Sequence, residues 1–195
     1  MRCKHCKETF EPLRFNQKFC LKSECIAKGY DEHWKKRKKE TSIDVHSQKH
    51  KTTLQNEINK LSRMIDEHCG YVTCIDCDTK LDMQVHGAHF HNVKGNENIR
   101  YNLHGIHSAT SQCNRFDSEH KTRYKIGLVN RYGLEYFEYV SNEIPQKYKS
   151  VHLTNKEIFE AIAVVRKLQR TLHTYKSKDG CFLRTICNNI IGFYK

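Results

Sequence analysis

The sequence predicts an α+β fold in which helices surround one short β-rich segment and two cysteine-rich modules. Three observations support this prediction. Cys-x-x-Cys pairs begin at residues 3 and 74, apolar residues recur at helical spacing over 52–68 and 154–172, and residues 81–90 have the mixed pattern of paired strands. We expect an N-terminal cysteine module at 1–30, a basic linker and scaffold helix at 31–70, a β-containing core at 71–140 and a helical C-terminal region at 141–195.

The composition indicates a polyanionic partner. The 195-residue chain has 34 Lys and Arg against 22 Asp and Glu, which gives a formal net charge of +12. Basic surfaces gain affinity for nucleic acids by releasing counterions condensed on phosphate. The alternative is a basic protein that is merely soluble. No apolar run reaches the roughly 20 residues of a membrane helix, and the start MRCKHCKETF is unlike a signal peptide. We therefore expect a cytoplasmic protein without a membrane partner.

The first module has the spacing of a structural zinc site. Cys3-x-x-Cys6 and Cys20-x4-Cys25 place four thiolates where they can close tetrahedrally on Zn²⁺. The segment between the pairs alternates apolar and polar residues around Pro12, as a short hairpin does. Ten cysteines in a chain without a signal peptide favour thiolate ligands over disulfides. Four unrelated free cysteines, the alternative, would leave the module with almost no core.

Two features follow in the second segment. The basic run KKRKK at 35–39 is either a solvated linker or helix face, or a strap that follows phosphates, and the sequence leaves both open. Residues 52–68 form an amphipathic helix that Gly70 is suited to end. Its apolar stripe consists of Leu54, Ile58, Leu61 and Ile65.

Three histidines lie within six residues in the third segment. Hydrolysis of a phosphodiester requires a base and a cation, and histidine can serve as either base or ligand. On a flat strand His89 and His91 share a face while His86 points away. Gly87 would permit a bulge that brings His86 and His89 to one site. Purely structural histidines are the alternative.

The C-terminal region contains the clearest helix. Thr154 and Glu157 form a capping box, and apolar residues from Ile158 to Leu172 follow on one stripe. The tail DGCFLRTICNNIIGFYK is apolar for a terminus, so it either folds back or meets a second subunit. Its two cysteines, Cys181 and Cys187, lack a second pair and are expected to be buried thiols.

Taken together, these motifs resemble the phage NinG (Rap) recombination nuclease family, of the HNH or His-Me finger type. The blocks that carry the resemblance are CKHCKETFEPLRFNQKFC with ECIAK, KHKTTLQNEINKLSRMID, and HGAHF with IRYNLHGIHSATSQCN and RYG. They cover roughly residues 1–140 in the family's order. The resemblance implies small zinc modules around a ββα-metal nuclease core, and a metal-dependent endonuclease for branched DNA such as Holliday junctions.

The resemblance also implies roles for individual residues. His89 falls on the general base that deprotonates water, while His86 and Asn114 fall on the ligands of a catalytic Mg²⁺ or Mn²⁺. His120 is a further ligand or a phosphate contact. The basic residues expected to hold the DNA backbone are Arg100, Arg115, Lys121, Arg123, Lys36 and Arg37.

The second zinc site departs from the family pattern at one ligand. Thr110 stands where the family has a zinc-binding cysteine. The remaining thiols are Cys74, Cys77 and Cys113. The nearest candidate for a fourth ligand is His107, with Cys69 second. Without either, the site would be free of metal and held by packing.

A second departure affects the base. The middle Asn of the HNH pattern, which orients the base, aligns with Gly105, so Asn102 or His104 would have to replace it. Two alternatives to the junction endonuclease follow: a non-catalytic zinc-dependent DNA-binding protein, which the departures favour, and an HNH nuclease acting on linear duplex DNA. A four-way junction presents two equivalent strands, which suits a symmetric homodimer.

Overall fold

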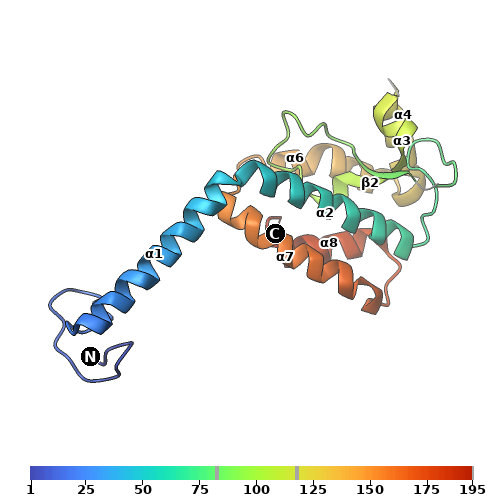
Figure 1. Cartoon of the computed structure of the whole chain (residues 1–195). Coiled ribbons are helices and arrows are strands. Elements are labelled where there is room, and N and C mark those ends of the chain that lie inside the picture. Colours follow the sequence, from blue (N-terminus) through green and yellow to red (C-terminus); the bar gives the residue numbers. More distant parts are fainter. Residues whose placement is uncertain (82–83, 117–118, 195) are drawn as a thin grey trace. The chain divides into compact units, whose positions relative to one another are not determined.

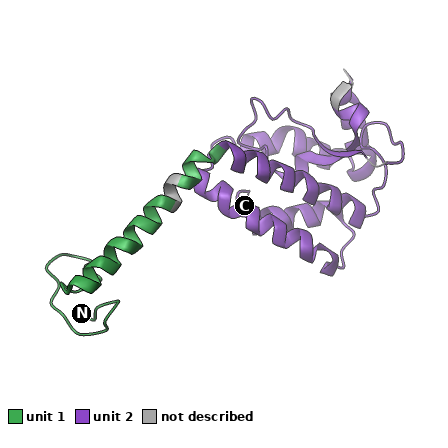
Figure 2. Cartoon of the chain, in the orientation of Figure 1, with its two compact units in different colours: residues 1–47 green, residues 48–195 purple. Residues whose placement is uncertain are grey.

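The computed structural model describes residues 1–81, 84–116 and 119–194, without the side chains of 39–41 and 115–116. It consists of two compact units, residues 1–47 and 48–195 (Figure 2). The described chain is mostly helical and contains one two-stranded sheet, which confirms the predicted α+β class. None of the described helices combines the length and the apolarity needed to cross a membrane.

The first unit consists of the cysteine module and one helix, α1 (Ser23–Val45). Its buried core is formed by three cysteines, against which Phe10 and Phe19 pack. The hairpin predicted around Pro12 is wrong: the described residues form turns and a single bridge between Arg2 and Thr9. The buried cysteines, and not a pair of strands, therefore form the centre of this segment. The basic run lies inside α1, so it is helical and not an irregular linker.

Three helices frame the second unit: α2 (Ser47–His68), α7 (Asn155–Thr171) and α8 (Gly180–Ile191) (Figure 1). The predicted stripe on α2 is fully buried, and the capping box at Thr154 and Glu157 opens α7. The tail folds back as α8. The shorter helices are η1 (Leu103–Gly105), α3 (Ser111–Phe116), α4 (His120–Tyr132), α5 (Leu134–Glu138), η2 (Tyr139–Glu143), α6 (Ile144–Lys147) and η3 (Leu172–Thr174).

The sheet pairs β1 (Val85–His89) with β2 (Ile106–Thr110) in antiparallel register, with Val85 opposite Thr110 and His89 opposite Ile106. The described part of 81–90 thus contains one strand, and its partner lies further along the chain than predicted. The pairing is continuous, so the predicted bulge at Gly87 is wrong. Glycine serves a different purpose there, because a Cβ at Gly87 would lie 2.8 Å from the Cβ of Asn59 on α2.

A buried ion pair connects the sheet to two of the framing helices. Arg184 of α8 donates from Nη2 to Asp66 Oδ1 of α2 over 2.6 Å, and both side chains are 0% exposed. The amide of Ser108 in β2 donates to the other oxygen, Asp66 Oδ2, over 2.6 Å. Arg184 also donates from Nε to the carbonyl of Leu103 over 3.1 Å. Each charge is therefore both paired and hydrogen-bonded, which burial requires.

We predict that Arg184→Met lowers the free energy of unfolding by about 3–5 kcal/mol, because the Asp66 carboxylate is left buried without its partner. Urea denaturation measures the loss. Arg166→Met is the matched control, since the ion pair of Arg166 with Glu57 joins α7 to α2 with half of the arginine exposed. Arg166→Met should lower the free energy of unfolding by about 1 kcal/mol at most. Equal losses in the two variants would contradict the account.

Candidate metal centres and histidine site

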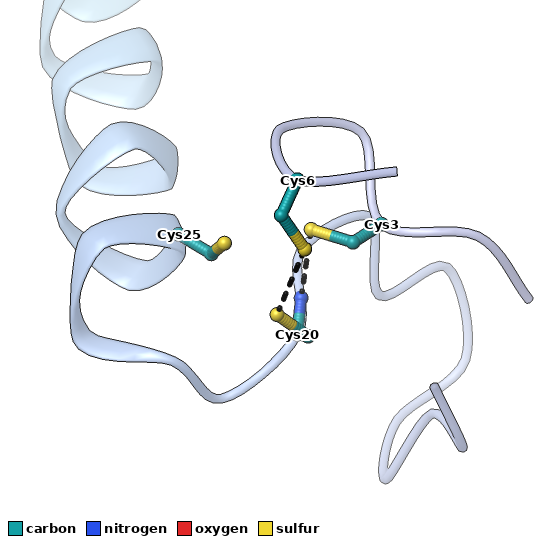
Figure 3. Close-up of side chains that lie close together, drawn as sticks. All are labelled: Cys3, Cys6, Cys20 and Cys25. Atoms are coloured by element: carbon teal, nitrogen blue, oxygen red, sulfur yellow. Dashed lines mark hydrogen bonds between the residues drawn. The ribbon is translucent and has the colours of Figure 1, made fainter. Parts of the chain in front are cut away.

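The four cysteines of the first unit converge on one point (Figure 3). The Sγ atoms of Cys3, Cys6, Cys20 and Cys25 all lie within 4.8 Å of one another, and three of these residues are buried. Three thiols from the segment before α1 and a fourth, Cys25, from the first turn of that helix suit tetrahedral zinc. The donor set fits a structural zinc ion, as the sequence predicts, and leaves no position open for chemistry.

The two Cys-x-x-Cys segments adopt the same turn. In each, the amide of the first cysteine donates over 2.8 Å to the carbonyl five residues later, which is Glu8 in one turn and Thr79 in the other. The residue after the second cysteine has a positive φ in both, 65° at Lys7 and 56° at Asp78. The turn at Cys74 thus has the backbone of a metal-binding knuckle, and not merely the sequence spacing.

Thr110 occupies the place of the missing fourth ligand. Cys74, Cys77 and Cys113 form the second thiol group, with Sγ atoms within 4.8 Å of one another. The amide of Thr110 donates to Cys74 Sγ over 3.3 Å, as the amide of Cys20 donates to Cys3 Sγ over 3.3 Å in the first unit. The two positions are equivalent. The second site therefore has three thiol donors and a hydroxyl where the fourth thiol would be.

The expectation that His107 completes this site is wrong. His107 lies on β2 with no exposed surface, and its Nδ1 is 3.0 Å from the hydroxyl of Tyr124 on α4. Burial lowers the pKa of His107 well below its usual value, with the charges of Arg184 and Arg131 adding to the effect. Cys69 also lies outside the thiol group within the described chain. His107 is therefore a core residue.

The structure brings His86 and Asn114 together. Nδ2 of Asn114, on α3, lies 3.2 Å from Nδ1 of His86, on β1, and both side chains are partly exposed. This contact joins the first strand to the helix that directly follows the second strand. A strand and a helix therefore bring an imidazole and a carboxamide together at one partly exposed point.

His120 lies at the start of α4 and is held by a carboxylate that sequence reasoning missed. Its Nδ1 is 2.8 Å from Oδ2 of Asp76, whose side chain is 0% exposed. Asp76 lies between the two cysteines of the second knuckle. A carboxylate in this position fixes the orientation of a histidine that uses its other nitrogen as a ligand. In the described chain, Asp76, His86 and His120 do not form a compact group like those of the thiols.

His89 lies on the opposite face of β1 from His86, because the uninterrupted pairing makes the side chains alternate. Its Nε2 is 3.1 Å from both Gln55 Nε2 and Asn59 Oδ1 of α2. Burial lowers the pKa of His89 to about 4, with the charge of Arg100 adding to the effect, so the ring is neutral at pH 7. The expectation that His86 and His89 share one site is therefore wrong.

The residues that orient His89 are not those expected. Asn102 and His104 are buried, and Asn102 Oδ1 accepts from the amide of His104 while His104 Nδ1 lies 3.0 Å from the hydroxyl of Tyr136. Gln55 and Asn59 contact His89 instead. Their only sequence signal is the i, i+4 spacing beside the apolar stripe, which polar helix surfaces commonly show.

The predicted DNA-contacting residues are distributed over both units. Lys36 and Arg37 lie on α1, in the first unit, and Lys121 and Arg123 lie on α4. The Arg37 guanidinium is 5.7 Å from the centre of the Trp34 ring. Arg100 precedes η1 and donates from Nε to Gln55 Oε1 over 3.1 Å. The side chain of Arg115 lies outside the described part of the structure.

Comparison with known proteins decides the family. A family model described as the bacteriophage lambda NinG protein matches residues 1–173. The chain belongs to the NinG family. Proteins named ninG from Escherichia phage 933W and Enterobacteria phage VT2-Sa are each 22% identical over 153 residues, which is 69% of this chain and 76% of theirs. No solved structure matches. The cysteine modules and the histidine-bearing sheet lie within the matched range, and α8 with Arg184 lies beyond it.

We predict that Thr110→Cys tightens zinc binding at the second site of this NinG protein by at least about tenfold, because it restores a fourth thiolate. Competition with a chromophoric chelator measures the affinity, and the first site should be unaffected. Thr122→Cys, which adds an exposed thiol on α4, is the control. The same affinity in wild type, Thr110→Cys and Thr122→Cys would refute the equivalence of Thr110 and Cys20.

Proposed function

We propose that this NinG protein is a metal-dependent DNA endonuclease that acts on branched recombination intermediates such as Holliday junctions. The observation that carries the proposal is the contact between His86 on β1 and Asn114 on α3. The order of strand, strand and helix, with polar side chains meeting between the first strand and the helix, resembles the ββα-metal core of HNH nucleases and so supports the proposal. Family membership and the formal net charge of +12 add support.

The donor chemistry at this point suits a hard cation. His86 offers Nδ1, and rotation of the Asn114 amide about its last torsion would present Oδ1 beside it. When bound there, Mg²⁺ or Mn²⁺ would neutralise the charge that develops on the phosphate and on the leaving oxygen. His120, whose ring is held by Asp76 at the start of α4, would contact a phosphate of the substrate.

The remaining residues would bind and position the DNA. Lys121 and Arg123 lie on α4, within three residues of His120, so they can hold backbone phosphates along the start of this helix. The zinc modules have a structural role. Asp76 lies in the loop between Cys74 and Cys77, and Cys113 immediately precedes Asn114. Zinc bound at the second site would therefore hold both Asp76 and Asn114 in position.

His86 and Asn114 support the nuclease as cation ligands, whereas the position of His89 does not support it as the base at the same point. The family resemblance implies that His89 deprotonates the attacking water. In this structure His89 contacts α2 on the other face of the sheet, so it would serve as the base only for a phosphate bound on that face. This separation favours the second candidate function, a zinc-dependent DNA-binding protein without catalysis.

We predict that His86→Ala and Asn114→Ala each lower the rate of junction cutting by at least about 100-fold while leaving junction binding intact, because each removes a ligand of one cation. The double variant should be no worse than either single one. The assay uses a labelled four-way junction and a linear duplex of equal length with Mg²⁺ or Mn²⁺. His173→Ala, an exposed histidine of η3, is the control.

Three outcomes would decide between the candidates. Junction binding by the wild-type protein without any cutting would favour the non-catalytic protein. Equal cutting of the junction and the linear duplex would favour an HNH nuclease without junction selectivity. Full activity of both alanine variants would overturn the assignment of His86 and Asn114 as ligands.

A further inference from the structure

A cleft of about 570 Å³ opens in the second unit, away from the thiol groups. It lies among the start of α2, the loop at 95–101 and the segment at 149–153 between α6 and α7. Three separate segments thus line it with cationic side chains. These are Lys51 from α2, Arg100 from the loop, and Lys149 from the segment before α7. His152 of the same segment also lines the cleft. Glu97 is the one carboxylate among the described lining residues.

The three cations of this cleft are not held in ion pairs. Within the described chain, none of Lys51, Arg100 and Lys149 forms an ion pair with a carboxylate. Elsewhere in the same unit, Arg166 and Arg184 are both paired with carboxylates. Three cations against the single carboxylate of Glu97 leave a net positive charge at the cleft, and the resulting potential favours a bound anion.

Arg100 is held in place before any ligand binds. Its Nε donates to Gln55 Oε1 over 3.1 Å, and its guanidinium lies 5.1 Å from the centre of the Tyr101 ring. The hydrogen bond uses Nε, so the two terminal nitrogens of the fork can face a phosphate. An arginine fixed by two contacts loses less side-chain entropy when it binds.

We propose that this cleft binds the sugar–phosphate backbone of the DNA substrate. The inference rests on the proposed function, since it assigns a second contact region for the same substrate. The backbone fits better than a base, because the cations supply charge, while Tyr101 is only 2% exposed and offers no face on which a base could stack.

The cleft also bears on His89. Gln55 Nε2 lies 3.1 Å from His89 Nε2 and 3.5 Å from the carbonyl of Arg100, so one glutamine joins the histidine to the cleft. DNA bound along Lys51, Arg100 and Lys149 would therefore pass on the α2 side of the sheet, where His89 lies. The His86–Asn114 pair lies on the opposite side, so the two regions would contact different parts of a branched molecule.

The test compares two double variants that lose the same charge. Lys51→Gln/Lys149→Gln removes two cations of the cleft, and Lys167→Gln/Lys176→Gln removes two exposed lysines that do not line it. Fluorescence anisotropy with a labelled four-way junction, without Mg²⁺ and Mn²⁺, measures affinity over a series of salt concentrations. Thermal unfolding of each variant checks that the fold is retained.

We expect the cleft variant to weaken junction binding by about tenfold or more. The negative slope of log affinity against log salt should become shallower by about 2, because two phosphate contacts are lost. The control variant should change both quantities much less. Equal effects in the two variants would overturn the inference and leave the proposed nuclease standing. Failure of the wild-type protein to bind DNA at all would overturn both.

Discussion

The arrangement of the second unit depends on one buried carboxylate. Asp66 of α2 accepts from Arg184 of α8 through one oxygen and from the amide of Ser108 in β2 through the other. A two-stranded sheet is marginally stable by itself, so its position has to be imposed by the helices around it. Asp66 holds the middle of β2 through the amide of Ser108. The hydrogen bond from Arg184 to the carbonyl of Leu103 holds the segment that leads into β2. The faces that present His86 and His89 are fixed as a consequence.

Sequence reasoning was successful where local rules decide. The apolar stripe of α2, the capping box at Thr154 and the first cysteine group follow from spacing alone, whereas Cys113 of the second group was assigned by the family resemblance. It was unsuccessful where packing decides. The role of Gly87 could not be read from the sequence, because the close approach of Asn59 that requires a glycine exists only after α2 packs against the sheet. The pairing of Asp66 with Arg184 joins residues 118 positions apart, and no local pattern connects them.

The candidate site was predicted in part for the same reason. His86 and Asn114 lie together as the family resemblance implies, although they are 28 positions apart. The fourth zinc ligand and the orientation of His89 could not be settled from the sequence, because both depend on which face of a strand a side chain occupies. His107 turned out to contact Tyr124 in the core, and the neighbours of His89 come from α2. Asp76 could not be identified from its position inside a knuckle loop, since its importance comes from its contact with His120.

The central claim is that His86 holds a catalytic cation, and the cutting of a four-way junction by His86→Asp in Mg²⁺ tests it most directly. A carboxylate is a good ligand for a hard cation but a poor replacement for an imidazole in packing or in stacking. If His86 is a ligand, His86→Asp should retain cutting within about tenfold of the wild-type rate, since the essential ligand chemistry is preserved. If His86→Asp is as inactive as His86→Ala while it still folds and binds the junction, the cation is not held at His86 and the account is wrong.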